Sequence, residues 1–179
     1  MKSIFKTLAL MAMSIAMVGL VACDPEPDPE PDTTPSVDPT VASTTYAFNY
    51  QNRSLEPGQT VYFYPTAQEE NNDWATVRFF IENKTSDNVD AYIKIEKVEG
   101  PDAMNDLSVC FGETCKTGTC PWKYGPISLA PGVNNDLPIL FDYSPSKVGN
   151  KTVYMIMIGT GENLLDPQVM YLDVAAHAQ

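Results

Sequence analysis

The sequence predicts an all-β sandwich domain, and three observations carry this prediction. From residue 41 onward, apolar and polar residues alternate with a period of two in short runs, and no long run has helical spacing. Clusters of Gly, Pro, Asn and Asp separate these runs. About 140 residues follow the N-terminal tracts, which is enough for one domain with a packed core. We therefore expect an antiparallel β-sandwich of about 7–9 strands over residues 41–179.

Nine segments fit the pattern of a strand. In chain order they are 45–50, 60–64, 75–83, 90–98, 107–111, 127–129, 137–143, 152–159 and 168–175. Segments 75–83 and 90–98 each carry one apolar face, and a polar run lies between them, so we expect a hairpin. Residues 153–158 are apolar on both faces, which indicates a central strand. Pro138 restricts its strand to an edge or to a strand start.

The first residues of the chain are typical of an export signal. Lys2 and Lys6 precede an apolar run, residues 8–22, that is interrupted only by Ser14. This run is shorter than the roughly 20 residues of a membrane-spanning helix and matches the apolar region of a secretory signal. We expect residues 1–22 to be a signal peptide that is removed from the mature protein.

Cys23 follows Leu-Val-Ala, and this sequence resembles a bacterial lipobox. The resemblance implies that the Cys23 thiol is diacylated and that cleavage occurs just before it. A multiply acylated cysteine holds a protein on a membrane surface without spanning the bilayer. The alternative is an ordinary secretory signal with an incidental cysteine.

The next segment has the composition of a tether. Residues 24–39 contain six prolines and six acids and no basic residue, so they bury little apolar surface and are expected to be extended. We therefore place a disordered linker, beginning with the lipidated cysteine, at residues 23–40. An acidic tract after such a cysteine resembles the signal that exports some Bacteroidota lipoproteins to the outer face of the outer membrane, with the periplasmic face as the alternative. Asp-Thr-Thr at 32–34 resembles an O-glycosylation sequon of the same phylum, with Thr33 as the acceptor.

The charge of the chain argues against nucleic acid as a partner. Without residues 1–22, which carry two lysines and no acid, the chain has 9 basic and 23 acidic side chains and a net charge of −14. A surface that binds phosphates needs clustered Lys and Arg, and the sequence contains no such run.

Two parts of the domain resemble immunoglobulin-like surface and periplasmic modules. Residues 79–86, followed by 89–95, resemble the first part of these modules. In that part, an apolar strand, an Asn, a polar turn and a second strand follow one another. Residues 129–132, Leu-Ala-Pro-Gly, and the strand and Pro-to-Gly loop at 137–149 resemble their later half. The resemblance implies an immunoglobulin-like fold, and it transfers fold better than function.

Three cysteines remain after Cys23: Cys110, Cys115 and Cys120. In an oxidising compartment, the simplest state of three cysteines is one disulfide and one spare thiol. The stretch from Cys110 to Cys115 resembles a Cys-x-Gly-x-x-Cys segment of small Bacteroidota proteins with such domains. Because of this resemblance, and because Gly112 allows a tight turn, we favour Cys110 with Cys115; Cys115 with Cys120 is the competing bridge.

The sequence offers no catalytic constellation and no metal site. His177, the only histidine, is third from the last residue, and no Gly-x-Ser-x-Gly motif accompanies it. The three domain cysteines lack a fourth zinc ligand, because this histidine lies 57 residues beyond Cys120. We therefore expect a protein that is not an enzyme and holds no cofactor.

Aromatic residues in expected loops are the candidate binding residues. Trp122 and Tyr124 lie in the cysteine-rich segment, and Trp74 begins a strand after a polar run. Such rings stack on sugars or anchor a protein interface, or else they plug the end of the sandwich. The consecutive aromatics at 62–64 place at least one ring away from the core, unless both faces of that strand are covered.

These observations predict a non-enzymatic lipoprotein of the outer membrane, displayed at the cell surface, that binds or adheres to a protein or glycan. The alternative is a structural accessory subunit of an outer-membrane complex. That subunit would dock through a sheet edge or through the strand at 153–158.

Overall fold

The computed structural model describes residues 37–64, 75–100, 107–118, 120–143 and 151–175, all within the compact unit Thr34–Gln179. Every regular element in these ranges is a β-strand, and they contain no helix long and apolar enough to cross a membrane. In chain order the strands are β1 (Tyr46–Tyr50), β2 (Arg53–Ser54), β3 (Thr60–Phe63), β4 (Ala75–Asn83), β5 (Val89–Glu99), β6 (Leu107–Phe111), β7 (Thr114–Thr117), β8 (Trp122–Leu129), β9 (Gly132–Val133), β10 (Ile139–Tyr143), β11 (Lys151–Thr160) and β12 (Leu165–Ala175).

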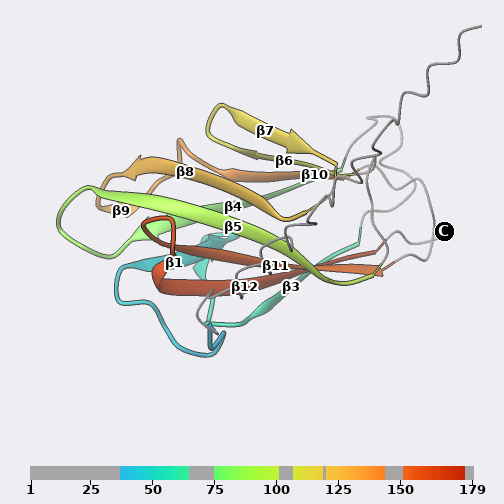
Figure 1. The fold of residues 1–179 in the computed structure, drawn as a ribbon, viewed down its shortest axis with the longest axis horizontal. Helices are drawn as coiled ribbons and strands as arrows, with labels where there is room; N and C mark the ends of the chain where they lie inside the picture. The colour runs from blue at the N-terminus through green and yellow to red at the C-terminus, as the bar shows by residue number, and fades with distance from the viewer. Residues whose placement is uncertain (1–36, 65–74, 101–106, 119, 144–150, 176–179) are drawn as a thin grey trace, which may run out of the picture. The chain divides into compact units, whose positions relative to one another are not determined.

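These strands form two sheets that enclose one main core. The seven-stranded sheet has the order β2-β1-β4-β10-β6-β7, with β9 also paired to β4, and the five-stranded sheet has the order β3-β12-β11-β5-β8. The long strands β5, β11 and β12 run beside one another (Figure 1). The chain thus folds as an immunoglobulin-like β-sandwich, which confirms the predicted fold class.

The core forms where the apolar faces of the two sheets meet. In β4, Val77, Phe79 and Ile81 are buried, while β11 contributes alternate residues from the opposite sheet to the same cluster. Phe79 meets Phe141 edge to face, with their ring centroids 5.9 Å apart. Burial of a side chain of this size contributes about 1.5–3 kcal/mol, so the alternating pattern supplies most of the driving force for the sandwich.

The predicted hairpin of β4 and β5 is wrong, because these strands belong to different sheets. β4 pairs with β1, β9 and β10, whereas β5 pairs with β8 and β11. Each of the two strands has one apolar face. The apolar face of β4 and the apolar face of β5 are both buried, because the strands lie in opposite sheets and face each other across the core. The buried Asn83 side chain holds the connecting turn: its Nδ2 donates to the carbonyls of Asp87 at 2.7 Å and Leu129 at 3.1 Å.

All nine predicted strands are present, and the structure adds β2, β7 and β9. Two of the added strands have only two residues, and β7 forms a hairpin with β6, so the described ranges contain twelve strands where about 7–9 are expected. The pairing is antiparallel except between β3 and β12, which run parallel. The central position of β11 is confirmed, and β10 begins at Ile139, directly after Pro138.

The described chain enters the domain along the β11–β12 hairpin. Asp166, in that hairpin, accepts hydrogen bonds from the backbone N–H groups of Thr44 and Thr45 and from the hydroxyls of Ser43 and Thr44, at 2.8–3.0 Å. Partial burial raises the pKa of the Asp166 carboxyl, but these hydrogen bonds outweigh it and lower the pKa to about 2. One carboxylate therefore fastens the entry segment to the five-stranded sheet.

A candidate binding groove on the five-stranded sheet

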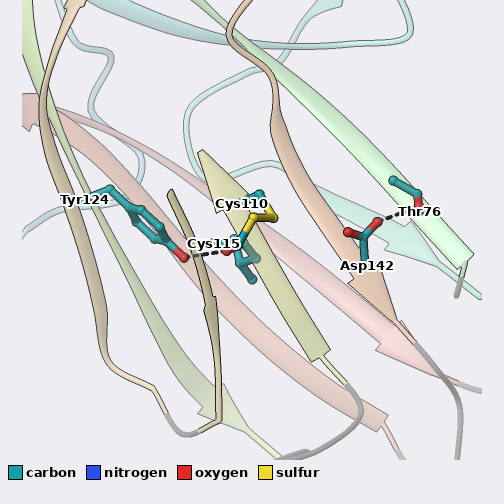
Figure 2. The surroundings of a disulfide bond; sticks show 6 residues. Thr76, Cys110, Cys115, Tyr124 and Asp142 are labelled. Carbon is teal, nitrogen blue, oxygen red and sulfur yellow. Dashed lines mark hydrogen bonds between the residues drawn. A yellow bond between two sulfur atoms is a disulfide. The ribbon is translucent and has the colours of Figure 1, made fainter. Parts of the chain in front are cut away.

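Trp122 and Tyr124 do not lie in an exposed loop, so the expectation that their rings are exposed for ligand binding is not met. Both belong to β8 and face the core, with only 5% and 4% of their surfaces exposed. The Tyr124 hydroxyl donates to the carbonyl of Val109 at 2.9 Å, which ties β8 to the opposite sheet (Figure 2). Burial, with a contribution from the charge of Cys120, raises the pKa of the Tyr124 phenol. These rings plug the core, which was the alternative interpretation.

The structure contains the Cys110–Cys115 disulfide, with an S–S distance of 2.02 Å. Figure 2 shows the bond between the two cysteines, which are directly opposite each other in the β6–β7 hairpin. Gly112, with a positive φ of 59°, lies in the turn between them. Cys120 lies outside this bridge and is partly buried against the main core.

The other predicted residues lie outside the described ranges. These are Cys23, Thr33, Trp74 and His177. Within the described part of the chain, no group of three or more His, Cys, Asp or Glu side chains is placed to hold a metal ion.

A groove of about 270 Å³ opens on the outer face of the five-stranded sheet, the face turned away from the core. Strands β5 and β8 form one part of its lining and the β11–β12 turn forms the other. Its lining residues are Tyr92, Ile93, Lys94, Lys123, Tyr124, Gly125, Glu162 and Leu164. Since the Tyr124 ring faces the core, the outward side chains of the groove are one aromatic ring, two ammonium groups and one carboxylate, with the apolar Leu164 in the turn.

The two lysines of the groove lie directly opposite each other on neighbouring strands. Lys94 of β5 pairs in register with Lys123 of β8. Lys94 is 12% exposed and forms an ion pair with Glu96 at 2.6 Å. Lys123 is exposed and makes no ion pair with any residue that the structure describes. Like charges opposite each other in a sheet are destabilising, and the Glu96 carboxylate offsets this repulsion by pairing with Lys94.

Tyr92 lies between two glycines, Gly159 of β11 and Gly125 of β8. A Cβ atom on Gly125 would lie 2.7 Å from the Ala91 carbonyl oxygen and 3.0 Å from Cδ1 of the Tyr92 ring. A Cβ on Gly159 would lie 2.7 Å from the backbone of Leu164. Because both glycines lack side chains, the Tyr92 ring and the β11–β12 turn can approach the sheet closely.

The β11–β12 turn brings Glu162 to the groove. Leu164 adopts a positive φ of 52°, which is uncommon for a leucine, and its side chain is buried on the outer face with Met157 and Val169. Tyr92 and Val37 pack against the same small cluster. This second cluster fixes the turn over the sheet, so that the exposed Glu162 lines the groove.

The sequence analysis names Trp122 and Tyr124 as candidate binding residues, but the outward side chain at the groove belongs to Lys123. Lys123 lies between Trp122 and Tyr124, and in a strand the residue between two inward side chains points outward. Tyr92 and Lys94 alternate in the same way with the buried residues of β5. The alternation was readable in the sequence, but the pairing of β5 with β8 across a register shift was not.

A second exposed feature is the β3 edge of the five-stranded sheet. Tyr62 and Tyr64 are 63% and 40% exposed, and their ring centroids are 5.9 Å apart. Nearby, the Lys151 ammonium lies 3.3 Å from Glu99 and 3.5 Å from the buried Asp173. The exposure of Tyr62 and Tyr64 confirms the prediction that the strand at 62–64 turns at least one ring away from the core.

No family model and no curated protein matches the chain. Among solved structures, the N-terminal domain of PorA is similar over 73% of this chain and 96% of that chain, with a TM-score of 0.52 and 10% identity. The CooA pilin subunit from enterotoxigenic Escherichia coli is similar over 75% of this chain and 99% of that chain, with a TM-score of 0.45 and 12% identity. At these identities, the likeness to the PorA domain supports the sandwich fold and nothing finer.

Proposed function

We propose that the protein is a non-enzymatic, membrane-anchored binding module. A lipid on Cys23 holds it at the outer membrane, the acidic tract at residues 24–39 serves as a tether, and the sandwich binds a ligand at the cell surface. The groove between β8 and the β11–β12 turn is the observation that carries the proposal.

The chemistry of the groove supports binding rather than catalysis. Its lining contains no Ser, Cys or His side chain, so it lacks the usual nucleophiles and the usual base. It does combine an aromatic ring with charged groups on rigid strands, which is the composition of many ligand sites. Leu164, with its positive φ, also lines this groove, and such backbone strain is concentrated at functional sites.

Binding of glycans and peptides by the mature lipoprotein in detergent tests the proposal. We expect a glycan or peptide to be retained by the wild-type protein and lost when Lys123 is replaced by glutamate. Arg78→Glu makes the same charge change at an exposed position on the other sheet and serves as the control. A ligand that binds both variants as it binds the wild type would place the site elsewhere.

The β3 edge favours a second candidate, a structural accessory subunit of an outer-membrane complex. Strand β11 is a poor docking surface, because Val153 and Met157 on its outer face are only 9% and 2% exposed. Tyr62 and Tyr64 instead offer exposed aromatic surface beside a sheet edge, as protein interfaces often do. Stable co-purification with one outer-membrane complex that is abolished by Tyr62→Ala, but not by Lys123→Glu, would favour this candidate.

A further inference from the structure

From the chemistry of the groove, we infer that its ligand is an acidic glycan, bound through one sugar residue that carries a carboxylate. This inference rests on the proposed binding function and names its ligand class. In this arrangement Lys123 and Lys94 hold the carboxylate, Tyr92 contacts a face of the sugar ring, and Glu162 accepts hydrogen bonds from sugar hydroxyls.

The positive charge around the groove is the first argument. Outside residues 1–22 the chain has 9 basic and 23 acidic side chains, yet Lys94 and Lys123 both line the groove, and Lys116 lies beside it. Lys116 reaches from β7 and donates from its ammonium to the Lys123 carbonyl, and that ammonium lies 4.8 Å from the centroid of the Tyr124 ring. Because Lys94 is paired with Glu96, the exposed Lys123 ammonium is the charge that an anion would neutralise, and a neutral ligand lacks this charge-assisted hydrogen bond.

The size of the groove and its uncharged surfaces are the second argument. A volume of about 270 Å³ is at the small end of ligand sites, and it suits a single sugar residue better than a long side chain with its backbone. The partly exposed Tyr92 ring provides an apolar surface for the C–H face of a sugar. Ionised Glu162 only accepts hydrogen bonds, so it complements hydroxyl groups and repels a second anionic group.

The overall charge selects the type of anion. With a net charge of −14 after residue 22, the protein repels ligands that carry many charges, such as polyphosphates and nucleic acids. A carboxylate carries a single charge that one exposed ammonium and its neighbour can balance. Acidic peptides share this group but lack the ring of hydroxyls that Glu162 complements.

A glycan array with matched pairs tests the inference on the mature lipoprotein in detergent. The array presents uronic-acid and sialic-acid glycans, the same glycans with the carboxyl reduced to an alcohol, sulfated glycans, neutral glycans and acidic peptides. We expect binding to the carboxylate glycans, at least a roughly 10-fold loss on reduction of the carboxyl, and a similar loss for Lys123→Glu. Arg78→Glu should bind as the wild type does.

The other outcomes overturn different parts of the account. In one such outcome, neutral or sulfated glycans bind as well as the carboxylate glycans do, and Lys123→Glu does not weaken that binding. This result would refute recognition of a carboxylate, but the protein would still be a binding module. Retention of acidic peptides instead of glycans would refute the glycan class in the same limited way. If no glycan or peptide is bound by a folded wild-type protein, both the inference and the proposed function fail.

Discussion

At the scale of single residues, Asp166 shows how one side chain positions a whole segment. It sits at a positive φ of 50° and accepts hydrogen bonds from three successive residues, 43–45, more than 120 positions away. The sequence gives no sign of this contact, because a Leu-Asp-Pro sequence at the start of a strand is ordinary in composition. Only the fold brings the entry segment to the hairpin.

We predict that Asp166→Asn lowers the free energy of unfolding by about 1–2 kcal/mol, because an amide lacks the charge and turns a donor toward other donors. Since the folded pKa of about 2 lies below the ordinary value of 3.8, the carboxylate stabilises the protein above about pH 4. That stabilisation is lost as the pH falls through about 2. Urea unfolding at about pH 7, 4 and 2.5 should therefore show that the difference in free energy of unfolding between wild type and variant becomes smaller as the pH falls. Glu162→Gln, in the turn just before β12, should unfold as the wild type does.

Tyr124 provides a second prediction at this scale. Tyr124→Phe keeps the buried ring but leaves the Val109 carbonyl without its 2.9 Å hydrogen bond, so we expect a loss of about 1–2 kcal/mol in thermal or urea unfolding. Tyr62→Phe, at an exposed ring, should change stability by much less. Equal effects of the two substitutions would mean that the hydrogen bond between the sheets contributes nothing.

At the scale of strands, the alternation of apolar residues predicts where strands lie better than which strands pair. Alternation locates β4 and β5 because a half-buried strand must alternate, whereas a continuous apolar run locates β11. Alternation could not tell a hairpin from two strands that face each other across the core, since both bury the same residues. Alternation does not reveal β2 and β9, because strands of two residues leave no pattern. It also does not reveal the inward direction of Trp122 and Tyr124 when their segment is assigned to a loop.

The close approach of β5 and β8 gives a prediction for this scale. Gly125 has a φ of 117°, and a Cβ added to it would lie 2.7 Å from the Ala91 carbonyl oxygen. Because backbone strain of this kind costs on the order of 1 kcal/mol or more, Gly125→Ala should lower the free energy of unfolding by more than about 1 kcal/mol. Gly132→Ala is the matched control, because Gly132 also has a positive φ, of 86°, but a Cβ added there would have no atom within 4 Å. If Gly125→Ala lowers the melting temperature more than Gly132→Ala does, the difference is due to the steric clash of the added Cβ, because both positions share the positive φ.

At the scale of the whole molecule, the N-terminal region and the domain have separate roles. The lipobox-like sequence and the acidic, proline-rich tract predict where the protein is held, and they say nothing about what it binds. The domain supplies the groove, and the described chain enters it beside the cluster that supports the β11–β12 turn.

We predict that Cys23→Ala moves the protein from the membrane fraction to the soluble fraction, because the anchor is lost while the domain stays intact. Mass spectrometry of the mature wild-type N-terminus should show an acylated Cys23. Protease treatment of intact cells should remove the wild-type domain if it is displayed on the outer face. A Cys23→Ala protein that stays with the membrane would contradict lipid anchoring.

The most direct test of the groove as the functional site compares four proteins on one glycan array: the wild type, Lys123→Glu, Tyr62→Ala and Arg78→Glu. If the groove beside β8 is that site, the wild type, Tyr62→Ala and Arg78→Glu bind the same carboxylate glycans, and Lys123→Glu loses them by at least about 10-fold. Binding that survives in Lys123→Glu but disappears in Tyr62→Ala would contradict this claim and assign the ligand to the β3 edge.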